Sequence, residues 1–179
     1  MKKLLTLFAI CTAIAGYSQK VTDSTFYGAI KAGMLKSDFE EHIGDVRIKI
    51  MEDEYHLVPT FHNNDAELIE LDIESMAEPL ENFSIIEKKM LSLYEVVSEK
   101  HGRPNTLSLI KDPEYIPDGD LTTITYWKVG EKLISIGAKR QDGKYVAVCN
   151  IHLIGYDEKL YDRDRDLEQA KKAKVAERF

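Results

Sequence analysis

The sequence predicts an α+β fold in which helices pack on one face of an antiparallel sheet of about five strands. In residues 69–74, apolar and acidic side chains alternate with a period of two, as in a strand that buries one face. In residues 85–100, apolar side chains recur at helical spacing instead. Segments of these two kinds follow one another in the order α, ββ, α, βββ, α, which is typical of helices that cover one side of a sheet.

The first expected elements are a short helix at residues 37–42 and a hairpin. The hairpin strands, at residues 55–61 and 67–73, flank residues 62–65, a run of turn-forming histidine, asparagine and aspartate. The alternation in the second strand gives it an acidic face, which we expect to meet solvent.

The longest expected helix spans residues 85–100. Ser84 and Glu87 form a capping box at its start, and Gly102 with Pro104 ends it. Its apolar stripe is expected to cover the sheet.

Three strands and a charged helix are expected to complete the chain. The strands lie at residues 121–128, 132–140 and 144–154, and a turn at residues 141–143 joins the last two. The helix is expected over residues 157–179. One face of the final strand carries Tyr145, Ala147, Cys149, Ile151 and Leu153. The other face carries Val146, Val148, Asn150 and His152. The lone Cys149 is expected to be buried.

Residues 1–18 have the organisation of a secretory signal peptide. Lys2 and Lys3 precede an apolar run of about a dozen residues, and small residues follow at the cleavage positions. The run is shorter than the roughly 20 residues that a membrane span needs. Cys11 follows the bulky Ile10 inside the run, so we interpret it as an ordinary apolar residue and not as a lipid attachment site.

The domain organisation follows from this signal. We expect residues 19–156 to form a single exported α+β domain, periplasmic or extracellular, followed by the charged helix at residues 157–179. Cys149 would be the one cysteine left after cleavage, so no intramolecular disulfide can form.

Charge limits the classes of partner. Removal of Lys2 and Lys3 lowers the 24 basic residues to 22, which leaves a net charge of −9 against 31 acidic residues. Such a chain is repelled by nucleic acids and by anionic membranes. We therefore expect no nucleic-acid partner, and after the signal no segment is apolar enough to span a membrane.

His56, His62, Glu70 and Asp72 are the candidate metal ligands. The two histidines are six residues apart and are expected on one face of the first hairpin strand, and the two carboxylates lie on the second strand. Imidazole and carboxylate groups together can bind a divalent metal. The alternative is an ordinary polar sheet face, because zinc sites usually have tighter ligand spacing.

The acidic loop at residues 112–120 is a second candidate site. Its aspartates alternate in part as calcium ligands do, but the loop lacks the twelve-residue spacing of an EF-hand. It is interpreted as a solvated loop that can serve as a partner-contact edge. The candidate partner-binding residues are Asp118, Asp120 and Trp127.

Nucleophilic catalysis has one conceivable pair in the last strand, Cys149 and His152. These two residues are three positions apart in the strand, so their side chains point to opposite faces and cannot meet. No nucleotide-binding, serine-hydrolase or zinc-protease motif occurs. No catalytic residue and no cofactor is therefore expected, although a carboxylate pair for glycoside hydrolysis stays open.

Three short patterns carry a resemblance to a known group of proteins. They are residues 30–34 followed by Ser37-Asp38-Phe39, residues 61–64 leading into Leu68-Ile69, and residues 100–104 with the later Trp127. They resemble small exported bacterial α+β domains of unassigned activity, including outer-membrane-assembly-lipoprotein-like and β-lactamase-inhibitor-protein-like modules. A mature chain beginning at Gln19 is also similar to exported proteins of the Bacteroidota. One departure from the lipoproteins is that no cysteine stands at the mature N-terminus.

The resemblance implies a non-enzymatic binding or inhibitory module that contacts a protein or envelope partner. On the residues themselves, we expect such contact through the open side of the sheet and nearby loops. The alternative function is a small periplasmic metal-binding protein or hydrolase that uses His56, His62 and neighbouring carboxylates.

Overall fold

The computed structural model describes residues 24–43, 46–64 and 67–176. The expected signal peptide at residues 1–18 lies outside these residues. The strands are β1 (Thr25–Tyr27), β2 (Ile30–Lys31), β3 (Arg47–Ile50), β4 (Asp53–Phe61), β5 (Leu68–Ser75), β6 (Glu78–Pro79), β7 (Thr106–Leu107), β8 (Thr122–Val129), β9 (Lys132–Gln141) and β10 (Lys144–Leu153). The helices are α2 (Lys36–Ile43), α3 (Phe83–His101) and α4 (Tyr156–Ala176), with short 3₁₀ turns η1 (His62–Asn64), η2 (Leu80–Asn82) and η3 (Pro113–Tyr115).

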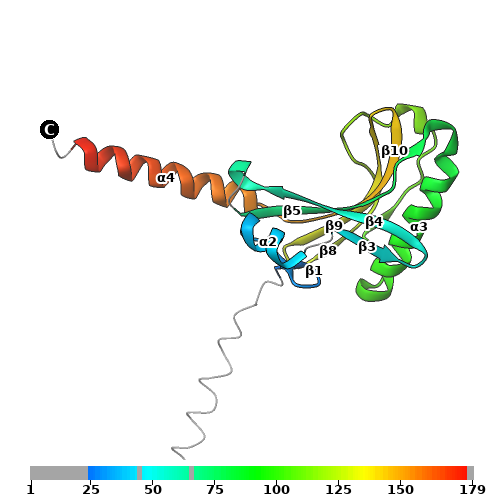
Figure 1. Ribbon diagram of the computed structural model, residues 1–179, viewed down its shortest axis with the longest axis horizontal. Coiled ribbons are helices and arrows are strands. Elements are labelled where there is room, and N and C mark those ends of the chain that lie inside the picture. Colours follow the sequence, from blue (N-terminus) through cyan, green and yellow to red (C-terminus); the bar gives the residue numbers. More distant parts are fainter. Residues whose placement is uncertain (1–23, 44–45, 65–66, 177–179) are drawn as a thin grey trace, which may run out of the picture.

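One large antiparallel sheet forms the body of the protein (Figure 1). Its strands run in the order β3-β4-β5-β10-β9-β8-β7, and β6 also pairs with β10, so the sheet has eight strands. β1 and β2 form a small separate sheet. Strand β10 lies at the centre because it pairs with β5 on one side and β9 on the other.

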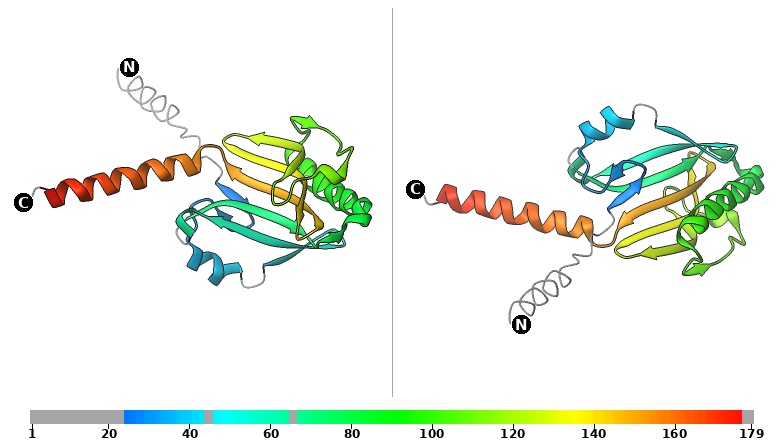
Figure 2. Two further views of the ribbon diagram at one scale, coloured as in Figure 1. Left: turned by 90° about the horizontal axis from the view of Figure 1, so that it is seen from above. Right: turned by 90° about the horizontal axis from the view of Figure 1, so that it is seen from below.

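The prediction of about five strands with helices on one face is wrong. The sheet is larger because it gains β3 and β7 at its edges and β6 beside β10. β6 and β7 have two residues each, too few to show an alternation in the sequence. α4 does not cover the sheet, since it extends away from the body in both views of Figure 2.

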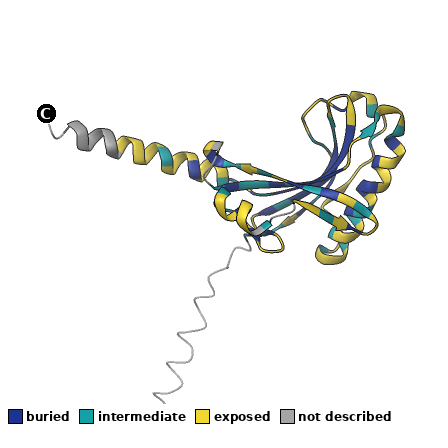
Figure 3. Cartoon of the chain, in the orientation of Figure 1, coloured by how far each residue is buried: buried dark blue, intermediate teal, exposed yellow. Residues whose placement is uncertain are grey.

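The core lies between α3 and one face of the central strands. The face of β10 that carries Cys149, with alternate residues from Tyr145 to Leu153, is buried there. Ile86, Met90 and Leu93 of α3 belong to the same buried cluster. Figure 3 shows these buried residues gathered along the middle of the sheet and on the inner side of α3.

The sequence predicts the end of α3 correctly but not its beginning. It starts at Phe83 behind Asn82 without a side-chain capping bond, so the predicted capping box of Ser84 and Glu87 is wrong. Its end agrees with prediction, because Gly102 has a φ of 77° and its N–H reaches the Ser98 carbonyl at 2.8 Å. Glycine tolerates this left-handed backbone without steric cost.

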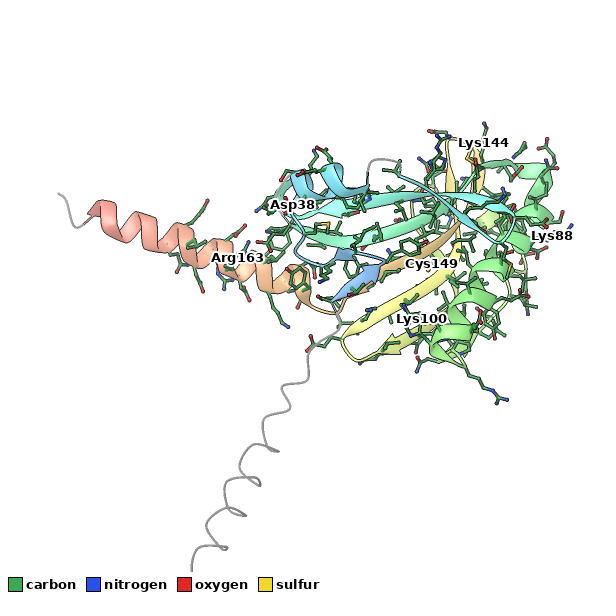
Figure 4. All side chains as sticks on the ribbon, turned by 60° about the horizontal axis from the view of Figure 1, so that its bottom comes forward. Asp38, Lys88, Lys100, Lys144, Cys149 and Arg163 are labelled. Atoms are coloured by element: carbon green, nitrogen blue, oxygen red, sulfur yellow. The ribbon has the colours of Figure 1, made fainter. Side chains whose placement is uncertain are left out.

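In the part of the chain that the structure describes, the contacts of α4 with the body lie at its beginning. Leu160 is buried, while Leu167, one heptad later, is exposed. The Arg163 guanidinium, labelled in Figure 4 where α4 leaves the body, donates to Glu67 at 2.7 Å. Among the described residues, no helix is both long and apolar enough to cross a membrane.

Candidate functional site

The candidate site lies on the face of the sheet that points away from α3. This open face consists of Glu70, Asp72 and Glu74 of β5, the alternate residues 146–152 of β10, and Lys139 of β9. Strand pairing sets these residues side by side, with Glu74 opposite Val148 and Lys139 opposite Val146. In the described part of the chain, the helix that packs on the sheet, α3, lies on the other side (Figure 1).

Lys139 crosses the central strand of this face. Its ammonium donates to a carboxylate oxygen of Glu74 and lies 3.5 Å from Asp72 Oδ2. β9 and β5 are the two neighbours of β10, so they are about 10 Å apart. The lysine side chain must therefore lie over Val146 and Val148, which are only 3% and 1% exposed although they lie outside the core. Its aliphatic part shields these valines from water.

A chain of hydrogen bonds continues from Asp72 along β10. Asn150 Nδ2 donates to Asp72 Oδ1 at 2.8 Å, and Asn150 Oδ1 lies 2.9 Å from His152 Nδ1. Because the amide oxygen can only accept, His152 Nδ1 carries the hydrogen of this bond. The neutral imidazole then has a free lone pair on Nε2. The network links His152, Asn150, Asp72, Lys139 and Glu74 across three strands.

Burial changes the ionisation of two groups on this face. Burial, followed by the charge of Asp72, raises the pKa of Glu70, and Asn150, His152 and Lys139 oppose the shift only in part. Burial alone would lower the pKa of Lys139, but its hydrogen bond with Glu74 and the charges of Glu74 and Asp72 raise it on balance. Lys139 is thus a fixed cation, whereas the negative charge of Glu70 is incompletely compensated.

A small hollow lies at each end of the open face. One, of about 230 Å³, is lined by Glu70, His152 and Asp157 together with Ile69 and residues 153–155. The other, of about 390 Å³, lies beside Glu74, His56, Asp142 and Lys144. Together, the open face and its hollows carry five carboxylates against two lysines. The carboxylates are Glu70, Asp72, Glu74, Asp142 and Asp157, and the lysines are Lys139 and Lys144.

The structure does not bring the four predicted metal ligands together. His56 lies within β4, with Nε2 3.0 Å from the Met76 sulfur. His62 lies beyond the end of β4, in η1, where it is buried and donates from Nε2 to Asp164 of α4 at 3.0 Å. Glu70 and Asp72 belong to the open face. No group of three or more metal-ligating side chains occurs among the described residues.

The predicted partner-contact residues have different environments. Asp118 is exposed and pairs with Arg140 through two bonds, of 2.6 and 3.1 Å, and this hydrogen bonding lowers the pKa of Asp118. Asp120 is exposed. Trp127 is buried under α3, and its indole N–H donates to the Gly102 carbonyl at 2.9 Å. A partner therefore cannot reach Trp127 in this structure.

Cys149 is separated from His152, as the alternation in β10 predicts. The thiol lies in the core, in the middle of the sheet in Figure 4, and His152 lies on the open face. Burial, with a smaller contribution from the charge of Asp72, raises the pKa of Cys149 to about 12. The thiolate that a nucleophilic mechanism needs is therefore scarce at neutral pH.

The sequence placed part of this site and missed its centre. Alternation put Glu70 and Asp72 on the solvent-facing side of their strand, and Asn150 and His152 on the face of the last strand opposite Cys149. No sequence pattern marked Lys139 as part of the site, because its contact with β5 depends on β10 lying between β5 and β9.

Comparison with known proteins finds no match: no family model, no curated protein and no solved structure is significantly similar to this chain.

Proposed function

We propose that this protein is an exported, non-enzymatic binding module that holds a basic segment of a protein partner on its open face. The observation that supports the proposal most is the cluster of five carboxylates with two lysines along β5, β10 and the two hollows, on the side of the sheet that α3 does not cover. Strand pairing places the further basic residues of this side, Arg47, Lys49 and Lys128, on the outer strands β3 and β8. Opposite charge on a partner raises both the rate and the specificity of association.

The hollow at Glu70 is the proposed anchor for one basic side chain. Its carboxylates, Glu70 and Asp157, can accept hydrogen bonds from one guanidinium, whose planar donors suit carboxylates in pairs. His152 Nε2 offers one further acceptor beside them. Glu74 and Asp72 already bind Lys139, so Glu70 is the carboxylate with most to gain from a new cation.

The rival function, a metal-binding protein or hydrolase built on His56 and His62, has less support. These histidines contact different partners, Met76 and Asp164, and no other described ligand set replaces them. Apart from Glu70, the charged and amide groups of the open face also bond to one another, which suits a rigid recognition surface.

The test uses a blocked tetra-arginine peptide, titrated into the purified protein by calorimetry. We expect saturable binding that is stronger at pH 7.5 than at pH 5, because Glu70 must be ionised to accept the guanidinium. Glu70→Gln should weaken binding about tenfold or more, the loss expected when one charged anchor is removed.

Glu87→Gln is the matched control, since it removes the same charge from the exposed side of α3. It should leave binding unchanged, and tetra-glutamate should not bind. Equal weakening by both variants would show attraction to net charge alone and would overturn the proposal, as would the absence of binding.

A further inference from the structure

The end of β7 and the loop that follows it expose large apolar side chains to an unusual extent. Leu109 is 83% exposed, Tyr115 79% and Leu107 62%. These are the three most exposed large hydrophobic side chains among the residues that the structure describes. We call residues 107–115 the apolar loop. Clustered exposed apolar groups mark interaction sites more often than scattered ones do.

The apolar loop is anchored at both ends, so the exposure of these side chains is built into the fold. The Ser108 N–H donates to the Ile124 carbonyl at 2.7 Å, which ties the beginning of the loop to β8. Ile116, just after the loop, is buried in the core. Beyond it, Asp118 pairs with Arg140, and Pro113 and Pro117 limit backbone freedom. A surface ordered in advance loses less entropy when it binds.

Charge around the apolar loop indicates the kind of partner. Residues 105–121 contain one lysine and four acidic residues, a net charge of −3, which Arg140 reduces to −2 because it pairs with Asp118. Asp112 and Glu114 are exposed between Leu109 and Tyr115 along the chain. A shallow groove of about 360 Å³, lined by Leu109, Ile110, Tyr115, Ile116 and neighbouring polar residues, runs between the loop and β8. The lysine, Lys111, lines the groove together with Asp112. The surface is therefore an apolar centre with an acidic rim.

We propose that the apolar loop is a second docking surface, which binds a protein segment whose apolar side chains are flanked by lysine or arginine. Leucine and tyrosine side chains would supply the contact area, and the acidic rim would select the basic flanks. An anionic lipid surface fits less well, because the acidic rim would be repelled by it. None of these residues belongs to the open face, so the inference does not depend on the proposed function.

The test uses a fluorescently labelled peptide, KKLFLLKK, with the full-length protein and fluorescence anisotropy. We expect saturable binding that the double variant Leu109→Ser/Tyr115→Ser weakens about tenfold, as removal of central apolar contacts does. A second peptide, KKSGSSKK, has the same charge. It should bind the unchanged protein no more tightly than KKLFLLKK binds the double variant. Because both substituted side chains are exposed, the fold should be retained, which the fluorescence of the buried Trp127 checks.

Leu91→Ser is the matched control, because Leu91 on α3 is 58% exposed and lies on a different element. It should leave binding of KKLFLLKK unchanged, and so should Glu70→Gln on the open face. Equal loss in Leu91→Ser, or no binding, would overturn the proposal. The proposal would also be overturned if the protein sedimented with vesicles of phosphatidylglycerol and phosphatidylcholine and Leu109→Ser/Tyr115→Ser abolished this sedimentation, since the surface would then bind lipid.

Discussion

Single residues determine the form of the open face. Lys139 covers two valines that no described helix shields, and Gly137 of β9 allows β8 to pass close by. A Cβ atom at Gly137 would lie 2.1 Å from the Thr122 carbonyl oxygen, next to the irregular pairing between Thr123 and Thr125. A real Cβ atom cannot lie so close to a backbone atom, so glycine is required here for steric reasons.

Gly137→Ala is therefore expected to destabilise the protein by about 3 kcal/mol, the upper range for overpacking, because backbone must move. Gly130→Ala is the comparison, since its Cβ would meet no atom within 4 Å but its φ of 65° costs about 1 kcal/mol for alanine. Urea unfolding followed by Trp127 fluorescence measures both. If Gly137→Ala costs no more than Gly130→Ala, the steric argument is wrong.

Glu70→Gln should stabilise the folded protein at neutral pH. Burial and Asp72 raise the pKa of Glu70 in the folded state, so folding favours the protonated form. The wild-type protein then has its full stability below the unfolded pKa near 4.5 and loses part of it as pH rises toward the folded pKa. Glutamine cannot ionise and avoids this loss. The gain at pH 7 should stay below about 1 kcal/mol, because Glu70 is partly exposed.

Urea unfolding of both proteins at pH 3.5 and pH 7 checks this prediction. The difference in free energy of unfolding should be present at pH 7 and absent at pH 3.5. The same difference at both values would show that packing, and not ionisation, distinguishes the two side chains. A stabilising variant that also weakens arginine-peptide binding would indicate that Glu70 is retained for binding at a cost in stability.

At the scale of elements, long segments and the short helix α2 could be predicted from the sequence, whereas the two-residue strands β6 and β7 could not. β4, β5, β10 and α3 each have enough residues to show a period, and they lie close to their expected spans. The same reasoning misplaced His62, because it assumed that the alternation of β4 continued past Phe61. The candidate site could not be predicted from the periodicity of the sequence alone. Lys139 contacts β5 only because of the order of the strands in the whole sheet.

Contacts with His62, and not a long apolar stripe, hold the beginning of α4 against the body. The His62 ring donates to Asp164 and packs edge-on against Tyr161, with ring centroids 4.5 Å apart. Asn63 also donates to Asp164, at 2.5 Å. These contacts join the β4–β5 connection to the second and third turns of the helix.

His62→Ala is expected to destabilise the protein by about 2 kcal/mol, because it leaves a cavity and removes a buried hydrogen bond. Amide hydrogen exchange should accelerate at residues 157–165 more than in α3, since the loss is local. His56→Ala is the matched control, because the His56 ring contacts Met76 and not α4. Uniform acceleration across the molecule would contradict the proposed local role.

At the scale of the whole molecule, one core supports two separate candidate surfaces. The inner face of β10 and the apolar side of α3 form that core, with Cys149 at its centre. The open face and the apolar loop lie outside it, so residues on either surface can change without removing core contacts. This separation is what makes the binding variants above interpretable.

The proposed export and the burial of Cys149 together predict the behaviour of the cysteines. The sequence contains Cys11 and Cys149, and the expected cleavage before Gln19 would remove the first. Protein recovered from the envelope should therefore contain one thiol per chain when titrated with Ellman's reagent in urea. Without urea that thiol should react only as fast as the protein unfolds, because Cys149 is buried and its pKa is raised to about 12. Two thiols in urea would show that residues 1–18 are retained, and rapid reaction of a single thiol in the native protein would contradict the burial of Cys149.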